Sequence, residues 1–243
     1  MSNFDDSNYV GTINYSDSME YVPDLTYEKI LVIKEKRNII IYKIYLFFMR
    51  AIDIILASIG IIVGLPIFII VSIAIKLDSP GKVFFVHNRI GKNEKKIGIY
   101  KFRTMVDGAD KLMHKFTDKQ KFEYEKNYKL DDDFRITKLG KFLRRTSIDE
   151  LPQLVNVLLG DMSLIGPRPV VKKELEKYGD NKDLLLSVKP GLTGYWQANG
   201  RSNTSYEERV QMDLYYVNNK SLLLDIKIIF KTIITVIKKE GAI

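Results

Sequence analysis

The feature that most constrains the fold of this chain is an uncharged, mostly apolar run of 22 residues from Ile54 to Ile75. At about 1.5 Å per residue, a helix of this length just crosses the roughly 30 Å core of a bilayer. A soluble helix that is apolar on all sides would be unusual at this length. Pro66 lies near the middle of the run, removes a helix hydrogen bond and disfavours helical angles at Leu65. We therefore expect a break in the helix at Pro66.

Positive charge flanks this segment on both sides. Lys43 and Arg50 precede it, and Lys76 and Lys82 follow it. Because lysine and arginine favour the cytoplasmic side of a membrane, a helix that crosses once cannot satisfy both flanks. The charges favour a re-entrant helix hairpin over residues 41–77 with both ends on the cytoplasmic side, and a kinked crossing helix is the alternative.

The rest of the chain divides into a tail and a domain. Residues 1–40 are polar, lack the basic and apolar regions of a secretory signal, and are expected to form a flexible tail. Residues 78–243 form the predicted catalytic domain on the cytoplasmic face. The absence of cysteine excludes structural disulfides and thiolate catalysis, and the net charge of +8 favours anionic partners.

The pattern of residues predicts an α+β fold that is predominantly helical. Short β-rich runs at 83–86 and 96–104, with Gly91-Lys92-Asn93 between them, indicate a small β-hairpin. Residues 221–239 are strongly apolar with interspersed lysines. This pattern is typical of a C-terminal amphipathic helix that lies in the membrane interface or packs on the domain.

The stretch from Leu139 to Pro169 carries the predicted active site. Apolar residues recur there at helical spacing and predict a buried helix that ends at Gly160. They are Leu151, Leu154, Val155, Leu158 and Leu159. Asp149 and Glu150 then lie at the start of this helix, where free backbone N–H groups and the helix dipole favour ionised carboxylates. Such carboxylates suit a nucleophile or a metal ligand.

A structural role for the two acids is the alternative. Ser147 and Glu150 have the spacing of a capping box, in which both side chains bond backbone N–H groups at a helix start. With Ser147 as the cap, Pro152 falls too far inside the helix. With Asp149 as the cap, Pro152 falls in the first turn, where proline is tolerated. The sequence leaves the cap assignment open.

Cationic side chains accompany the acid pair. Arg168 lies between two prolines, whose fixed φ angles limit the entropy lost in positioning it. Four cations precede the acids, namely Lys138, Lys141, Arg144 and Arg145. Lys101 and Arg103 emerge on one side of the predicted second strand, and Arg201 follows a Pro- and Gly-rich loop. Carboxylates with positioned guanidinium groups favour a phosphorylated substrate, and a solvated helix face is the alternative for Lys138 and Lys141.

Other polar residues give weaker indications. His87 and His114, the two histidines, have no partner at metal-binding spacing, and we interpret them as bystanders. Asp131-Asp132-Asp133 lacks the glycine and terminal glutamate of a calcium loop and is interpreted as a solvated turn.

Five segments in this order resemble the bacterial sugar transferase family, the monotopic polyprenyl-phosphate phosphoglycosyl transferases. They are KLDSPGKVFF, YKFRTM, LRRTSIDELPQLVNVLLGDMSLIGPRP, KPGLTGYWQANGR and DLYYVNNKSLLLDIKIIFKT. The resemblance covers roughly residues 45–239. It implies transfer of a sugar 1-phosphate from a UDP-sugar to undecaprenyl phosphate at the bacterial inner membrane, with release of UMP, as the first membrane step of surface polysaccharide synthesis. Nucleic acid is not among the implied partners.

The same resemblance implies roles for individual residues. Asp149 is the implied nucleophile, which forms a phosphosugar ester before transfer to the lipid, and Glu150 is the implied ligand of Mg²⁺. The candidate substrate-binding residues are Arg144, Arg168, Lys101, Arg103 and Arg201. Pro66 marks the break in the membrane segment.

The sequence departs from the family pattern at three positions. Leu65 stands where a serine usually precedes the membrane proline, His87 where glutamine is usual, and Phe134 where proline is usual. None of these is part of the acid pair. Two other functions stay open from the sequence, a glycosyltransferase that releases UDP and a non-enzymatic basic scaffold on the membrane. The oligomeric state, including a homodimer, is open as well.

Overall fold

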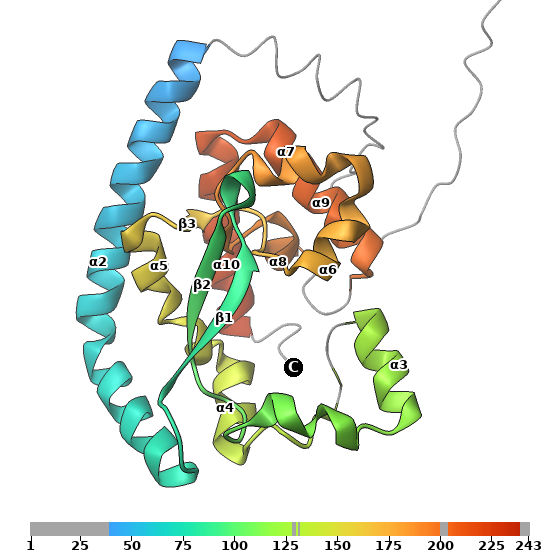
Figure 1. The fold of residues 1–243 in the computed structure, drawn as a ribbon. Helices are drawn as coiled ribbons and strands as arrows, with labels where there is room; N and C mark the ends of the chain where they lie inside the picture. The colour runs from blue at the N-terminus through green and yellow to red at the C-terminus, as the bar shows by residue number, and fades with distance from the viewer. Residues whose placement is uncertain (1–38, 128–129, 131, 200–203, 239–243) are drawn as a thin grey trace, which may run out of the picture.

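The structure, a computed structural model, describes residues 39–127, 130, 132–199 and 204–238. Most of the predicted tail and Arg201 lie outside the described residues. The described part is predominantly helical, as predicted, with two short two-stranded sheets (Figure 1). In chain order the elements, with η for a 3-10 helix, are α2 (Ile39–Asp78), β1 (Phe84–Ile90), η1 (Lys92–Glu94), β2 (Lys96–Phe102), η2 (Ala109–Lys115), α3 (Asp118–Asn127), α4 (Lys138–Thr146), η3 (Ile148–Glu150), α5 (Gln153–Leu159), β3 (Ser163–Ile165), α6 (Lys172–Leu175), η4 (Glu176–Asn181), α7 (Lys182–Leu186), β4 (Gly191–Thr193), α8 (Tyr195–Asn199), α9 (Tyr206–Asn219) and α10 (Leu222–Lys238).

α2 is one continuous helix of 40 residues with Pro66 inside it. The hairpin predicted over residues 41–77 is therefore not seen, and α2 instead runs as a single curved helix along one side of the molecule (Figure 1). The rest of the chain packs against α2 on both sides of the proline, burying Met49 before it and Val71 and Ile75 after it. Packing along this whole length favours one helix over a reversal of direction.

The described core consists of three apolar clusters, and α2 contributes to each of them. Near its N-terminus Met49 joins a cluster with residues of β3, α8 and α9. In the middle, Ala57 packs with residues of β2 and α5. Near its C-terminus, Val71 and Ile75 pack with Phe102 of β2 and Leu143 of α4. β2, α4 and α5, which lie around the predicted site, thus all pack against α2.

Two polar residues of α2 also fix its neighbours. The guanidinium of Arg50 donates to the carbonyls of Val157 at 2.6 Å and Leu158 at 2.8 Å, which lie at the end of α5. A cation at a helix C-terminus satisfies free carbonyls and complements the helix dipole. Asp53 is buried, and its Oδ1 accepts hydrogen bonds from Ser163 Oγ at 3.0 Å and Leu164 N at 2.8 Å. α2 therefore holds both α5 and β3.

The β-hairpin is confirmed, and α5 completes its open edge. β1 and β2 pair antiparallel along their full lengths. The fully buried amide of Asn156 donates to Gly98 O at 2.7 Å and accepts from Tyr100 N at 2.9 Å, in the manner of a third strand. Because Asn156 faces β2, the apolar face predicted for α5 is partly wrong, and Val155 and Leu159 are exposed.

α10 has the predicted amphipathic pattern. Ile228 is buried against the body, whereas Leu223 and Phe230 are exposed. Asp225 accepts hydrogen bonds from Tyr45 of α2 and from Tyr216 of α9, the latter at 2.8 Å. α10 thus packs on the body and still presents an apolar outer face, so both interpretations of this segment are compatible.

Candidate active site

The acid pair lies in a tight turn between α4 and α5. α4 ends at Thr146, the next residue Ser147 has a φ of 56°, and Asp149 and Glu150 follow in η3. Pro152 occupies the position before α5, where no side-chain cap is found. Both cap assignments considered from the sequence are therefore wrong, because neither Ser147 nor Asp149 caps α5 with its side chain. The two carboxylates are available for other contacts.

Glu150 is held by two cations. Its Oε1 lies 2.5 Å from Lys101 Nζ and 3.8 Å from Arg168 Nη1. Lys101 comes from β2 and Arg168 from the loop after β3, so segments distant in sequence converge here. Asp149 is only 7% exposed, and no hydrogen bond to its carboxylate is found within the described residues. Asp149 is thus the buried, unengaged acid, and Glu150 is the paired one.

The pKa values of the two carboxyl groups shift in opposite directions. Burial raises the pKa of Asp149 to about 6, although the charges of Lys101, Arg144 and Arg168 oppose the shift. Burial acts on Glu150 as well, but Lys101 and Arg168 outweigh it and lower the pKa of Glu150 to about 2. Neighbouring cations, rather than the helix end that we expected from the sequence, therefore keep Glu150 ionised.

The segment that carries Arg168 is positioned by close backbone packing. β3 pairs in parallel with β4, and Gly191 N donates to Pro167 O at 2.8 Å. A Cβ at Gly191 would lie 2.1 Å from Gly166 N, a distance that no side chain tolerates. Glycine at this position lets two backbones touch, and that contact places Arg168 opposite Glu150.

A shallow pocket that is open to solvent lies beside Glu150. Lys101 and Arg168 line it together with His87 and Arg89 of β1. His87, interpreted from the sequence as a bystander, thus lies in the wall of this pocket. A search for metal-binding spacing could not have placed His87 in the pocket. The alternation of side chains along β1 could have, because it puts His87 and Arg89 on the same face of the strand.

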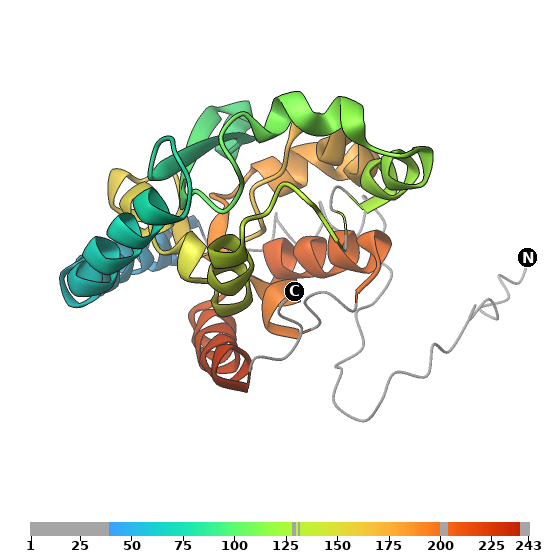
Figure 2. The same cartoon turned by 90° about the horizontal axis from the view of Figure 1, so that it is seen from below.

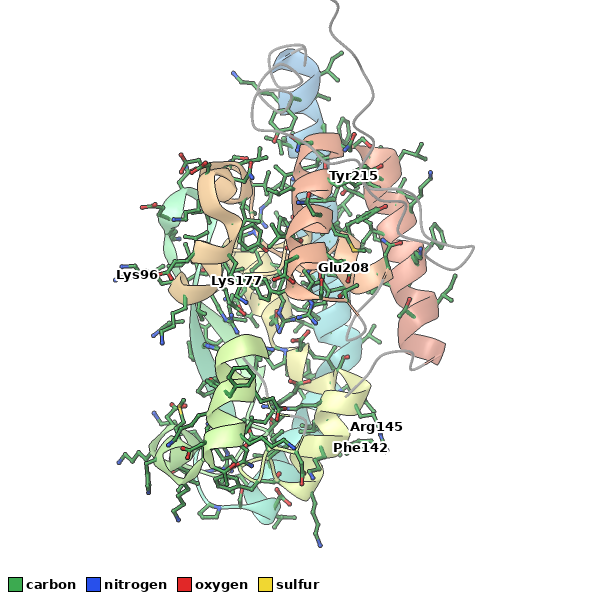
Figure 3. All side chains as sticks on the ribbon, turned by 90° about the vertical axis from the view of Figure 1, so that its right-hand side faces the viewer. Lys96, Phe142, Arg145, Lys177, Glu208 and Tyr215 are labelled. Carbon is green, nitrogen blue, oxygen red and sulfur yellow. The ribbon has the colours of Figure 1, made fainter. Side chains whose placement is uncertain are left out.

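Of the four cations that precede the acids in sequence, Arg144 is the one whose charge interacts with Asp149. Its Nε donates to Thr104 Oγ1 at 3.0 Å, and the charge of Asp149 offsets the cost of burying its guanidinium. Arg145 instead projects from the outer side of α4 together with Phe142 (Figure 3). Arg144 is therefore retained as a candidate phosphate-binding residue.

The two lysines of α4 belong to a solvated helix face, the alternative considered from the sequence. Lys138 is exposed, and Lys141 forms a surface ion pair with Asp132 at 3.1 Å. Of the solvated turn predicted at 131–133, Asp131 lies outside the described residues and Asp132 is exposed as expected. Asp133 is instead buried and pairs with Arg135 at 2.6 Å. The guanidinium of Arg135 also lies over the ring of Phe116.

Arg103 points away from the pocket. Its Nη1 donates to Pro80 O at 2.6 Å and its Nη2 to Ser79 O at 2.8 Å, just beyond the end of α2. β2 ends at Phe102, so the alternation that would place Arg103 beside Lys101 does not extend to it. The structure corrects its predicted place and gives it a structural role. Arg201, the remaining candidate, lies outside the described residues.

The acid pair offers carboxylate oxygens, the type of ligand that Mg²⁺ prefers. Mg²⁺ is usually held by one or two carboxylates together with phosphate oxygens and water. In the described part of the chain no group of three His, Cys, Asp or Glu side chains could hold a metal by itself. Asp149 and Glu150 offer two adjacent carboxylates in η3, and Glu150 lines the pocket. This donor set fits a metal that completes its coordination with the substrate.

Comparison with known proteins is consistent with this site. Residues 44–239 match the family described as bacterial sugar transferase. An uncharacterized sugar transferase of Haemophilus influenzae is 46% identical over 79% of this chain and 41% of its own length. The exopolysaccharide production protein ExoY of Sinorhizobium fredii is 42% identical over 79% of this chain and 87% of its own length. The undecaprenyl-phosphate galactose phosphotransferase of Salmonella typhimurium is 43% identical over 81% of this chain and 42% of its own length.

The chain therefore spans less than half the length of two of these relatives and most of the third. The matched region includes most of α2, the acid pair and the Arg168 loop, and it extends through α10. The chain belongs to the bacterial sugar transferase family.

Proposed function

We propose that this protein transfers a sugar 1-phosphate from a UDP-sugar to undecaprenyl phosphate and releases UMP, as an early membrane step of surface polysaccharide synthesis. The observation that carries the proposal is the buried carboxylate of Asp149, unengaged within the described residues, beside Glu150, Lys101 and Arg168. The Salmonella relative is named an undecaprenyl-phosphate galactose phosphotransferase, which supports a sugar phosphate as the transferred group and this lipid as the acceptor. A carboxylate that attacks a phosphate must overcome charge repulsion, and the nearby cations reduce it.

In the first step Asp149 Oδ attacks the β-phosphorus of the UDP-sugar. A carboxylate–phosphorus bond forms, and the bond from the β-phosphorus to the bridging oxygen breaks, so UMP leaves with the electron pair. Lys101, Arg144 and Arg168 bind and orient the phosphates. The product is an aspartyl phosphosugar, which separates binding of the polar donor from binding of the lipid.

In the second step an oxygen of undecaprenyl phosphate attacks the same phosphorus. The bond to Asp149 breaks, the carboxylate is regenerated, and the lipid diphosphate sugar leaves. Glu150, held ionised by Lys101, is the residue that would hold Mg²⁺. When bound, this ion supplies additional neutralisation of phosphate charge.

The outer face of α2 supports a membrane location next to the lipid. α2 is long and apolar enough to cross a bilayer, and its exposed apolar residues include Ile41, Phe47, Ile55, Ile62, Val63, Ile70 and Leu77. Ile41 and Leu77 are about 54 Å apart along the helix, which exceeds the roughly 30 Å bilayer core. α4 and α10 also carry exposed apolar residues, Phe142 and Phe230 among them, and in Figure 2 α2 lies at the left of the molecule and α10 at the bottom. We propose that the apolar outer face of α2 is embedded from the cytoplasmic face of the inner membrane without crossing it.

Labelling of single cysteines tests this topology, because the natural chain has none. Lys43→Cys and Asp78→Cys introduce exposed thiols near opposite ends of α2. Both are expected to react with a membrane-impermeant maleimide in inside-out vesicles and to resist it in spheroplasts. Lys141→Cys on α4 serves as the control for the face on which the domain lies. Reaction of the two ends from opposite sides would establish a crossing helix instead.

The released nucleotide tests the reaction. With Mg²⁺, undecaprenyl phosphate and a panel of UDP-glucose, UDP-galactose and UDP-N-acetylgalactosamine, we expect UMP from at least one donor. Release of UDP would instead identify a glycosyltransferase. Absence of any nucleotide product, with strong salt-dependent binding to acidic vesicles, would identify a membrane scaffold. The donor that yields UMP also identifies the sugar.

A further inference from the structure

β1 brings to the pocket wall two side chains that have no role in the steps above. His87 and Arg89 are separated by one residue and therefore lie on the same face of the strand. Both line the pocket beside Lys101 and Arg168. Their contacts determine what His87 can offer to a ligand.

Arg89 is held in place by Glu174, which follows the Arg168 loop in sequence. Nη1 of Arg89 lies 2.6 Å from Glu174 Oε2, and the two side chains are only 13% and 14% exposed. The same oxygen accepts a hydrogen bond from Val171 N at 2.8 Å. A buried ion pair that is also bonded to backbone has little freedom, so the guanidinium next to His87 is fixed.

Arg89 determines the tautomer of His87. Its Nη2 lies 3.4 Å from Nδ1 of His87, and a guanidinium can only donate, so Nδ1 must accept. The ring proton is then on Nε2. Burial and the charges of Arg89, Lys101 and Arg168 lower the pKa of His87 to about 4, so the ring is neutral at pH 7. His87 therefore offers a single N–H donor and no charge, and Nε2 has no partner within the described residues.

We propose that His87 is a substrate-binding residue whose Nε2–H donates a hydrogen bond to a phosphate oxygen in this pocket. The inference rests on the proposed function. A phosphate is the group that the surrounding cations Lys101, Arg89 and Arg168 select. The donor diphosphate and the lipid phosphate present the same kind of oxygen, and the two half-reactions distinguish them.

His87→Phe and His87→Gln form a matched pair of variants. Phenylalanine keeps a ring without a donor, whereas glutamine places an amide N–H near the position of Nε2. UMP released from enzyme with UDP-sugar alone reports the first half-reaction, and transfer from preloaded enzyme to undecaprenyl phosphate reports the second. We expect H87F to lower one of the two rates about 10- to 100-fold, the loss of one hydrogen bond to a charged group. H87Q is expected to stay within about threefold of wild type.

The step that is impaired identifies the phosphate. A loss in the first half-reaction assigns the hydrogen bond to the donor diphosphate, and a loss confined to the second assigns it to the lipid phosphate. Wild-type rates for H87F in both steps would overturn the proposal, as would equal losses in H87F and H87Q. Melting temperatures identify any variant that does not fold, and His87→Leu then replaces H87F.

Failure of the proposed function gives a different result. In that case the wild type releases no UMP, and calorimetric titration of wild type, H87F and H87Q with the UDP-sugars tests the hydrogen bond independently. Weaker binding by H87F alone would support it. Equal binding by the three proteins, or no binding by any of them, would overturn it.

Discussion

Replacing Asp149 with asparagine is expected to lower UMP release by at least about 10³-fold while the protein remains folded. Asparagine has nearly the same shape as aspartate, but its amide oxygen does not form a stable ester with phosphorus. Within the described residues the substitution removes no hydrogen bond to the carboxylate of Asp149. It also replaces a buried carboxyl group, whose pKa is raised to about 6, with a neutral amide, which removes the cost of burying a charge. The melting temperature should therefore stay the same or rise slightly.

Intact-protein mass spectrometry measures the step directly. Wild-type protein mixed with UDP-sugar and Mg²⁺, without lipid, is expected to gain the mass of a sugar phosphate at Asp149, and D149N is not. Asp161→Asn is a matched control, because Asp161 pairs with the exposed Lys95 at 2.7 Å and lies outside the pocket. Substantial turnover by D149N would remove Asp149 as the nucleophile. UMP that appears only after lipid is added, without an adduct, would argue for direct transfer between the two substrates.

The site's own segments could be predicted from local sequence. Asp149, Glu150 and Arg168 lie within twenty residues of one another in the chain, and the structure brings Glu150 and Arg168 within 3.8 Å. Side-chain alternation in the hairpin was sufficient to nominate Lys101, which pairs with Glu150. The same rule misplaced Arg103, because the strand ends one residue earlier, at Phe102.

Contacts between distant segments could not be predicted in this way. Asn156 interrupts an apolar pattern, and nothing near it indicates that its amide bonds the edge of β2, 56 and 58 residues away. Local sequence identifies Arg50 only as a positive charge that flanks the membrane segment. In the structure its guanidinium donates hydrogen bonds to carbonyls at the end of α5. Local sequence also predicts a break in the helix at Pro66, which is wrong. Contacts with distant segments on both sides of the proline keep α2 continuous.

Replacing Gly191 with alanine is expected to be the most damaging small substitution in the loop that faces the Arg168 segment. The added Cβ would lie 2.1 Å from Gly166 N and 2.4 Å from Thr193 O, and backbone atoms cannot move aside as a flexible side chain can. The β3–β4 pair must separate, which we expect to cost at least about 3 kcal/mol. For a chain of this size that lowers the melting temperature by roughly 6–12 °C. Because Arg168 lies only three residues after the end of β3, the remaining folded protein should bind nucleotide sugar poorly.

Gly64→Ala provides the matched control for this prediction. Its Cβ would meet only the side chain of Phe68, at 3.4 Å, and alanine in a helix is favoured over glycine by up to about 1 kcal/mol. The melting temperature of G64A should therefore equal or exceed that of wild type, with unchanged UMP release. If G191A were as stable and active as G64A, the backbone contact between Gly166 and Gly191 could not be what positions Arg168. The placement of that arginine would then have to come from the Pro167 and Pro169 rings alone.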